Sequence, residues 1–246
     1  MNPILPCYSK TLLLFVLLAT LSASCKKGNE PPGADGSRLR VKTVTNGNTT
    51  TSYSYDSEGR VVKAELDGGF YKETYSYEPV KVIHTIANAD GTFTYLNETG
   101  SNGLVTLKQQ QGGNTITYYE YDDKGHITRT YTNDIPVFET GYYYNPDNGL
   151  LDSMRSNKGG QWTATSVFLY ADDQVNTISD ENFGRLFYAR TFPRPVKSVA
   201  IRRPDGNSVT VSITSYTYTF DNHKHITTRS FTTSGGQSGT ETYTYY

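Results

Sequence analysis

The chain has few cysteines and no concentration of charge of either sign, and each absence excludes a class of protein. Only Cys7 and Cys25 occur among the 246 residues, so the fold is not held by a network of disulfides. The 23 basic and 24 acidic residues give a formal net charge of −1, without the basic stripe typical of nucleic-acid binding. No segment after residue 24 carries a sustained apolar stripe at helical spacing, which predicts strands and little helix.

The first 24 residues have the three parts of a secretory signal. Lys10 precedes an apolar run over residues 11–21, and small residues follow the run. A transmembrane helix is the alternative, but such a helix needs about 20 apolar residues to span a bilayer. Because Lys26 and Lys27 end the run too early, we expect residues 1–24 to be a signal peptide.

The small residues before Cys25 resemble the lipobox of bacterial lipoproteins. In that family the cysteine is lipidated and becomes the new N-terminus, and several acyl chains anchor the protein in a membrane. The match has one departure, because Ser22 stands where the family usually has leucine and Leu21 lies one position further out. The resemblance implies a lipid anchor at Cys25, and an ordinary free thiol at this position is the alternative.

Residues 25–37 contain mostly turn-forming and charged residues after the cysteine, which predicts a flexible tether. Some lipoproteins that are exported to the cell surface carry an acidic run directly after the cysteine, whereas this chain has Lys26 and Lys27. By that resemblance we expect a lipid-anchored protein on the periplasmic face of the outer membrane, with the cell surface as the alternative. Residues 38–246 are expected to form a single β-repeat domain.

A hairpin-like string recurs along this domain. The clearest copies cover residues 53–62, 119–128 and 218–226. Each has two aromatic residues separated by one residue, then an aspartate, a short turn and a β-branched residue. Alternation along a strand puts both aromatic rings on one face. The aspartate opens the turn, glycine closes it, and the β-branched residue begins the return strand.

The repeated acidic residues have two interpretations, as turn formers or as catalytic carboxylates. A catalytic pair occurs once, whereas these positions recur in each copy of the string. We therefore assign them to the turns of a scaffold. The turn-forming residues are Asp56, Gly59, Asp122, Gly125 and Asp221.

Repetition of one hairpin predicts an all-β fold. We expect an antiparallel meander of these repeats that forms a curved or partly rolled sheet. The aromatic anchors recur at intervals near 22 residues, but 50 residues separate Tyr170 from Phe220, and Phe192 could supply a copy in this gap. Residues 192–195 contain two prolines, which predicts an edge, a bulge or a break between two halves.

The repeated units resemble the YD repeats of RHS-type proteins, and also small repeat lipoproteins of Bacteroidetes that are mostly domains of unknown function. Residues 143–153 are similar to the Tyr-Tyr-Asp-Pro-x-x-Gly stretch of RHS cores. Long RHS proteins wind such repeats into a shell around a toxin. This chain is much shorter and carries no toxin segment, so we expect an open sheet in place of a closed shell.

His223 and His225 lie on one face of a strand end and could form a metal pair. A third ligand at useful spacing is missing from the sequence. His225 also occupies the repeat position of His126 and Arg60, which predicts a solvent-facing turn exit. We therefore expect no metal and no cofactor.

Three aromatic residues are candidates for stacking on a ligand: Trp162, Tyr118 and Tyr143. Trp162 follows two glycines at a loop tip, and the two tyrosines point away from their paired neighbours. Packing on the second face of the sheet is the alternative interpretation. The paired tyrosines themselves are expected to form the core, because an aromatic ring buries a large apolar area.

These observations predict a non-enzymatic cell-envelope lipoprotein. We expect it to bind a protein or glycan partner at one face or at a free sheet edge, and to bind no nucleic acid. The alternative is a glycan-acting enzyme in the periplasm or at the surface. That enzyme needs a facing pair of acids in a groove, such as Glu139 with Asp152 or Glu181.

Overall fold

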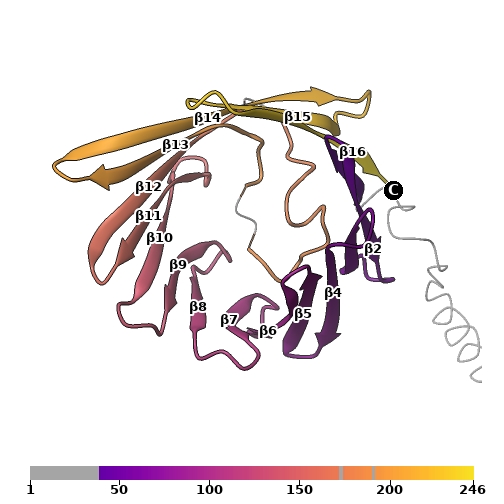
Figure 1. Cartoon of the computed structure of the whole chain (residues 1–246), viewed down its shortest axis with the longest axis horizontal. Coiled ribbons are helices and arrows are strands. Elements are labelled where there is room, and N and C mark those ends of the chain that lie inside the picture. Colours follow the sequence, from indigo (N-terminus) through magenta and orange to yellow (C-terminus); the bar gives the residue numbers. More distant parts are fainter. Residues whose placement is uncertain (1–38, 172–173, 190–191) are drawn as a thin grey trace, which may run out of the picture. The chain divides into compact units, whose positions relative to one another are not determined.

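The computed structural model describes residues 39–171, 174–189 and 192–246, and these form a closed antiparallel β-barrel (Figure 1). The sixteen strands are β1 (Val41–Asn46), β2 (Thr49–Tyr55), β3 (Val61–Leu66), β4 (Lys72–Glu78), β5 (Lys81–Asn88), β6 (Gly91–Thr99), β7 (Val105–Gln110), β8 (Ile116–Tyr121), β9 (Ile127–Thr132), β10 (Phe138–Tyr144), β11 (Leu151–Lys158), β12 (Gln161–Tyr170), β13 (Val196–Asp205), β14 (Ser208–Phe220), β15 (Ile226–Thr233) and β16 (Ser238–Tyr245). Each strand pairs with the next one in sequence, and β16 pairs with β1.

The signal peptide expected over residues 1–24, the tether over 25–37 and its Cys25 lie outside the described residues. Within the part that is described, no helix is long and apolar enough to cross a membrane.

The expected all-β class is correct, but the expected open, curved or partly rolled sheet is wrong. The two terminal strands lie side by side, with Val44 opposite Tyr243 and Asn46 opposite Glu241. An open meander would leave the backbone groups of β1 and β16 unpaired along two edges. Closure pairs both edges, and the right-handed twist between neighbouring strands allows a long meander to curl until its ends meet.

Tyrosine hydroxyls tie neighbouring units together near the ends of the strands. Tyr55 Oη donates to the backbone oxygen of Val41 at 2.6 Å, and Tyr121 Oη donates to that of Val105 at 2.6 Å. The same bond joins Tyr77 to Val61, Tyr170 to Leu151, Tyr218 to Val196 and Tyr245 to Ile226. Each acceptor is the first residue of a strand. These tyrosines therefore supply both buried surface and a hydrogen bond, which phenylalanine could not do. In the copy over residues 218–226 the donor is the first aromatic, Tyr218, and the second is Phe220.

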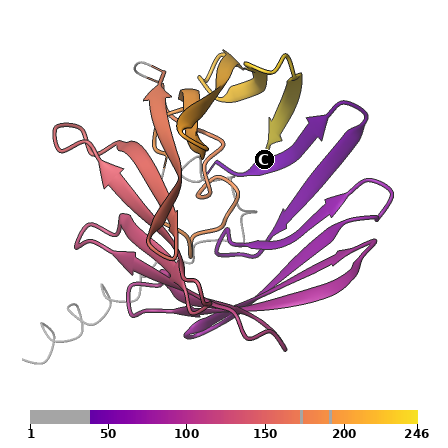
Figure 2. The same ribbon diagram turned by 60° about the vertical axis from the view of Figure 1, so that its left-hand side comes forward.

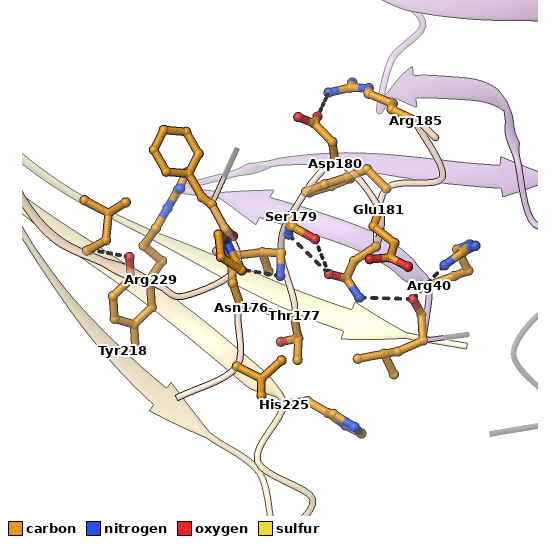
Figure 3. Close-up of a pocket in the computed structure, with 18 of the residues that line it drawn as sticks. Arg40, Asn176, Thr177, Ser179, Asp180, Glu181, Arg185, Tyr218, His225 and Arg229 are labelled. Carbon is orange, nitrogen blue, oxygen red and sulfur yellow. Dashed lines mark hydrogen bonds and ion pairs between the residues drawn. The ribbon is translucent and has the colours of Figure 1, made fainter. Parts of the chain in front are cut away.

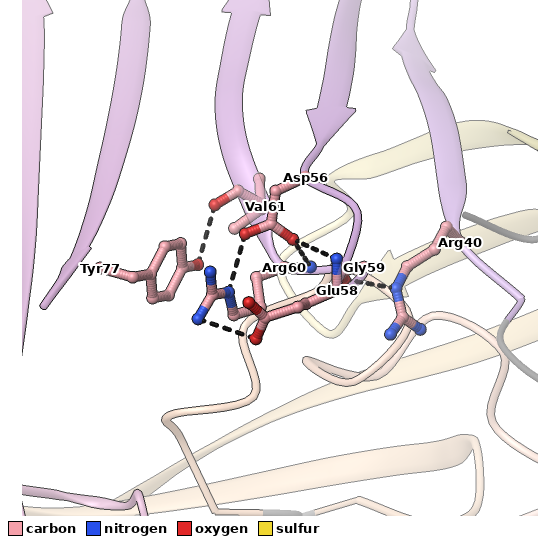
Figure 4. Close-up of polar contacts among 7 residues, drawn as sticks. All are labelled: Arg40, Asp56, Glu58, Gly59, Arg60, Val61 and Tyr77. Carbon is pink, nitrogen blue, oxygen red and sulfur yellow. Dashed lines mark hydrogen bonds and ion pairs between the residues drawn. The ribbon is translucent and has the colours of Figure 1, made fainter. Parts of the chain in front are cut away.

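The repeated turns are built around their aspartates (Figure 4). Asp56 Oδ1 accepts from the backbone N–H groups of Glu58 and Arg60 at 3.0 and 2.9 Å. Gly59 has a φ of +74°, which favours glycine. The turns at Asp122 and Asp221 repeat these two backbone bonds.

The residue after each turn is half-buried, so the expectation of a solvent-facing exit is wrong. Arg60 donates from Nε to Asp56 Oδ2 at 2.8 Å, and its guanidinium lies 4.4 Å from the ring centre of Tyr77. His126 and His225 fold back onto their own aspartates in the same way. An arginine or histidine here therefore connects the turn to the neighbouring hairpin.

Residues 174–189, here called the inner segment, run inside the barrel and form no strand (Figures 1 and 2). The segment is bound along the strand ends by backbone hydrogen bonds from wall residues. The N–H groups of Val41, Val61 and Val105 donate to the oxygens of Asn182, Gly184 and Phe187 at 3.0, 3.1 and 3.0 Å. This inserted segment accounts for the long interval between Tyr170 and Phe220.

The inner segment also supplies the centre of the core. Phe187 packs in a cluster with Val61, Tyr75, Val82 and Val105. Phe183 packs in a second cluster, and the Phe183 and Tyr53 ring centres lie 5.1 Å apart. Burying each phenylalanine contributes about 1.5–3 kcal/mol, so the inner segment stabilises the wall that it touches.

Candidate ligand-binding cavity

A cavity of about 1190 Å³ lies between the inner segment and the wall formed by β12 to β15 (Figure 3). This volume is large enough for a ligand of several rings, since small-molecule sites typically measure about 300–1,000 Å³. The cavity reaches the surface beside Val175, which is 71% exposed, and beside Lys224 in the β14–β15 turn. A solute can therefore approach it from the end of the barrel where the aspartate turns lie.

Aromatic side chains form the wall of the cavity. Tyr216 and Tyr218 lie two residues apart on β14, and alternation directs both rings to the inside. The Tyr218 hydroxyl is held by its bond to the Val196 oxygen at 2.7 Å. Phe168 on β12 adds a third ring, with its centre 5.2 Å from that of Phe192. The wall thus offers flat apolar surfaces held in fixed orientations.

Arg229 projects from β15 into the same space. Its Nε donates to Glu241 Oε2 at 2.9 Å, and Nη2 lies 2.6 Å from the same oxygen. Burial lowers the pKa of Arg229, but the neighbouring Tyr243 and Glu241 outweigh this effect, so its pKa is raised overall. Arg229 is therefore a fixed cation beside the aromatic wall.

A second charged group comes from the inner segment. Arg185 lies between Asp180, with Nη1 3.9 Å from Oδ1, and Glu73 of β4, with Nη2 3.5 Å from Oε2. Burial raises the pKa of Asp180, and the Arg185 charge partly offsets the rise. The Nε atom of Arg185 is buried without a hydrogen-bond partner. Asp180 and Arg185 both line the cavity and present polar groups opposite the aromatic wall.

Glu73 of β4 connects the inner segment to the wall through its ion pair with Arg185. It accepts hydrogen bonds from the hydroxyls of Tyr71 and Tyr75, and His84 Nε2 lies 3.2 Å from its Oε2. Burial alone would raise the pKa of Glu73. The nearby His84 ring, the hydrogen bonds from Tyr71 and Tyr75 and the charge of Arg185 lower it instead to about 2. The carboxylate is therefore ionised at neutral pH.

The three aromatic residues proposed from the sequence do not line this cavity. Tyr118 lies on the outward face of β8 and stacks on Tyr131 with ring centres 5.0 Å apart. Tyr143 is on the outward face of β10 and is 54% exposed. Trp162 donates from Nε1 to Thr165 Oγ1 at 2.9 Å within β12. They are separate surface positions and form no common site with the cavity.

The turn aspartates do not converge either. Asp56, Asp122 and Asp221 each bind the amides of their own turn and are not cavity-lining residues. His223 and His225 stand at the mouth with ring centres 5.7 Å apart. Over the described ranges, no group of three or more histidine, cysteine or acidic side chains is arranged to hold a metal ion.

Sequence reasoning missed Asp180, Arg185, Tyr216 and Arg229 as members of one site. The available signal was the excess of residues between Tyr170 and Phe220, which breaks the hairpin interval. Such an insertion lies either outside or inside a barrel, and the repeat pattern does not distinguish the two positions.

The fold and this site define a closed β-barrel that encloses a ligand-sized cavity. No protein-family model matches the chain. Two solved structures are similar in fold, and both are described as porin-like proteins. The protein from Bacteroides uniformis has a TM-score of 0.58 and 16% identity, covering 85% of this chain and 96% of that one. The protein from Bacteroides vulgatus has a TM-score of 0.55 and 13% identity, covering 85% and 99%.

A curated relative is similar in sequence. The chain is 28% identical over 197 residues to the tRNA3(Ser)-specific nuclease WapA of Bacillus spizizenii. The match covers 77% of this chain but spans only 8% of the length of WapA. The nuclease activity in that name belongs to the full-length relative, of which this chain matches only a small part.

Proposed function

We propose that this protein is a cell-envelope lipoprotein whose barrel binds a glycan in its cavity and catalyses no reaction. The observation that supports binding most directly is the aromatic wall of the cavity opposite fixed charged groups. The expected YD-repeat character and the lipid anchor at Cys25 belong to the same proposal. The fold likeness to porin-like proteins is compatible with an envelope location.

A sugar ring has two kinds of surface that match this cavity. Its C–H face packs on an aromatic ring, and its hydroxyls require donors and acceptors at the rim. Tyr216 and Tyr218 supply the rings, and Arg229, Arg185 and Asp180 supply the polar groups. Because these side chains are already held by protein contacts, little conformational entropy is lost when a ligand binds.

The outward faces of the barrel favour a membrane attachment through lipid over a barrel that crosses the bilayer. Thr43 bonds Thr244, and Ser230 bonds Thr240, on the outside of β1, β15 and β16. Salt bridges occupy the outside of other strands, including Lys63 with Glu65 and Arg129 with Glu139. Lipid-facing positions of membrane barrels carry an apolar band, whereas these positions are polar. We therefore propose that the barrel stands outside the bilayer; the periplasmic face of the outer membrane is proposed from Lys26 and Lys27, which follow Cys25 in place of an acidic run.

The Cys25→Ser variant tests the anchor. We expect it to lose labelling by radioactive palmitate and to leave the membrane fraction, because the thiol that accepts the lipid is gone. Cys7→Ser is the matched control and should retain the label. Palmitate still present in Cys25→Ser would contradict the lipoprotein assignment and leave the cavity assignment unaffected.

Glycan binding is tested by calorimetry of the full-length protein with peptidoglycan fragments and with neutral and acidic oligosaccharides. We expect at least one class to bind, and Tyr216→Ala to weaken its binding by about tenfold or more, since a buried aromatic contact contributes about 1.5–3 kcal/mol. Tyr143→Ala removes an aromatic ring outside the cavity and should leave affinity unchanged.

Two results would overturn this proposal. Binding to none of the glycans, or an equal loss of affinity in Tyr216→Ala and Tyr143→Ala, would exclude the cavity as the glycan site.

Mass spectrometry of the recovered oligosaccharides checks the alternative of a glycan-acting enzyme. Asp180, whose pKa is raised by burial, is the acid that such an enzyme would use, and shortened products that disappear in Asp180→Asn would favour it.

A further inference from the structure

The hairpin of β13 and β14 extends past its neighbours (Figure 1). Along β14, residues from Ser208 onward pair with β13, but pairing with β15 begins only at Thr214. The first part of β14 is therefore a strand edge with one partner in an otherwise closed barrel.

The backbone direction at this edge can be assigned from Ile213. Its N–H donates to Ser234 Oγ at 3.1 Å, and its oxygen accepts from the Ser234 N–H at 2.7 Å, so both groups point away from β13. Backbone groups alternate in direction along a strand. Val209 and Val211 have the same parity as Ile213, so their N–H and C=O groups point to the open side.

The edge lacks the features that prevent pairing with another chain. Exposed edges in natural proteins are usually protected by charges, proline or bulges. β14 carries no charged residue and no proline over its whole length. Val209 is 50% exposed and Val211 is 53% exposed, so an apolar row accompanies the unpaired backbone.

We propose that the open edge of β14 pairs with the same edge of a second copy of this chain. In an antiparallel pair with its two-fold axis at Thr210, Val209 of each copy lies opposite Val211 of the other copy. This register satisfies the outward backbone groups of both valines in both copies and groups four valine side chains. The uncharged edge matches itself without repulsion between like charges, so an identical copy is the partner that fits it. The inference does not depend on the contents of the cavity.

Oxidative cross-linking of the full-length protein tests this register. In Thr210→Cys the two cysteines face each other at a non-hydrogen-bonded position, where the Cα atoms of an antiparallel pair lie about 4.5 Å apart, within disulfide range. We expect a disulfide-linked species of twice the mass of the single chain on a non-reducing gel, and its disappearance when reductant is added. Thr232→Cys is the matched control, because Thr232 is exposed on β15 between two paired strands, and it should cross-link far less. The wild-type chain is a further control, because any cross-linked species that it forms must come from Cys7 or Cys25.

A second variant tests the association without cysteine. Native mass spectrometry of the wild-type chain in mild detergent should give dimers. Val211→Lys should give monomers with the circular dichroism spectrum of the wild type, because it adds a charge at the edge and removes nothing from the core. Monomers of the wild-type protein at every concentration would overturn the proposal. Equal cross-linking in Thr210→Cys and Thr232→Cys would also overturn it, and a different protein retained at this edge in place of a second copy would do the same.

Discussion

Replacing Gly184 with alanine is expected to lower the free energy of unfolding by roughly 3–5 kcal/mol. A Cβ atom at this position would lie 2.7 Å from the Val61 nitrogen and 2.8 Å from the Gly59 oxygen. Both are backbone atoms of the barrel wall and cannot rotate away. The residue also has a φ of +69°, which an alanine adopts at a further cost of about 1–2 kcal/mol. The inner segment would have to move off the wall, with loss of the bond from the Val61 N–H to the Gly184 oxygen.

Thermal unfolding measures this effect, and a drop of roughly 10 °C is expected for a domain of this size. Gly47→Ala is the matched control, because Gly47 has a similar φ of +59° but a Cβ atom added there would have no neighbouring heavy atom within 4 Å. It should show only the backbone cost. Equal destabilisation by the two variants would show that the inner segment does not press against the wall at Gly184.

Glu73→Gln is expected to destabilise the folded protein by about 3–5 kcal/mol at neutral pH, the range found when one partner of a buried ion pair is removed. The amide cannot balance the Arg185 charge, and its NH2 group cannot accept from both tyrosine hydroxyls. Urea unfolding gives the change. Glu65→Gln is the control, since Glu65 pairs with Lys63 on the outer surface, and we expect it to have little effect. A Glu73→Gln variant as stable as Glu65→Gln would contradict the role assigned to Glu73.

The same carboxylate predicts how stability changes with pH. The folded-state pKa of Glu73 is about 2, below its ordinary value of 4.5, so the folded protein holds this carboxylate ionised more strongly than the unfolded chain does. The contribution is complete above about pH 5 and is lost as the pH falls toward 2, with a total of about 3 kcal/mol. Unfolding of the wild type and Glu73→Gln should therefore converge in acid. A constant difference down to pH 2 would contradict the low pKa.

Local structure was predictable from the sequence wherever the repeat is clear. The string that begins at Tyr53 specifies two inward rings, an aspartate turn and a return strand at Val61, and these features depend on neighbours only a few residues apart. Closure was not predictable in the same way. It depends on the twist summed over all the strands and on the pairing of Val44 with Tyr243, and neither is encoded within one repeat.

The candidate site was harder to predict than the wall. Alternation along the strands correctly predicted that Tyr118 and Tyr143 point to the opposite side of the sheet from their paired neighbours. In the closed barrel that side is the outside, whereas the cavity lies on the inside. Two of the polar groups of the site, Asp180 and Arg185, lie in a segment without periodicity. Its position follows from long-range bonds such as the one between the Val105 N–H and the Phe187 oxygen, which no local pattern indicates.

The hydroxyl bonds between neighbouring hairpins have a consequence for how such proteins can change in size. The junction where β1 meets β16 has the same contact on either side of it, since Tyr55 of β2 donates to Val41 of β1 and Tyr245 of β16 donates to Ile226 of β15. A gene that gains or loses one hairpin therefore creates no new kind of junction. The circumference of the barrel, and with it the volume of its interior, can change by one hairpin at a time while the hydrogen bonds between neighbouring hairpins stay the same.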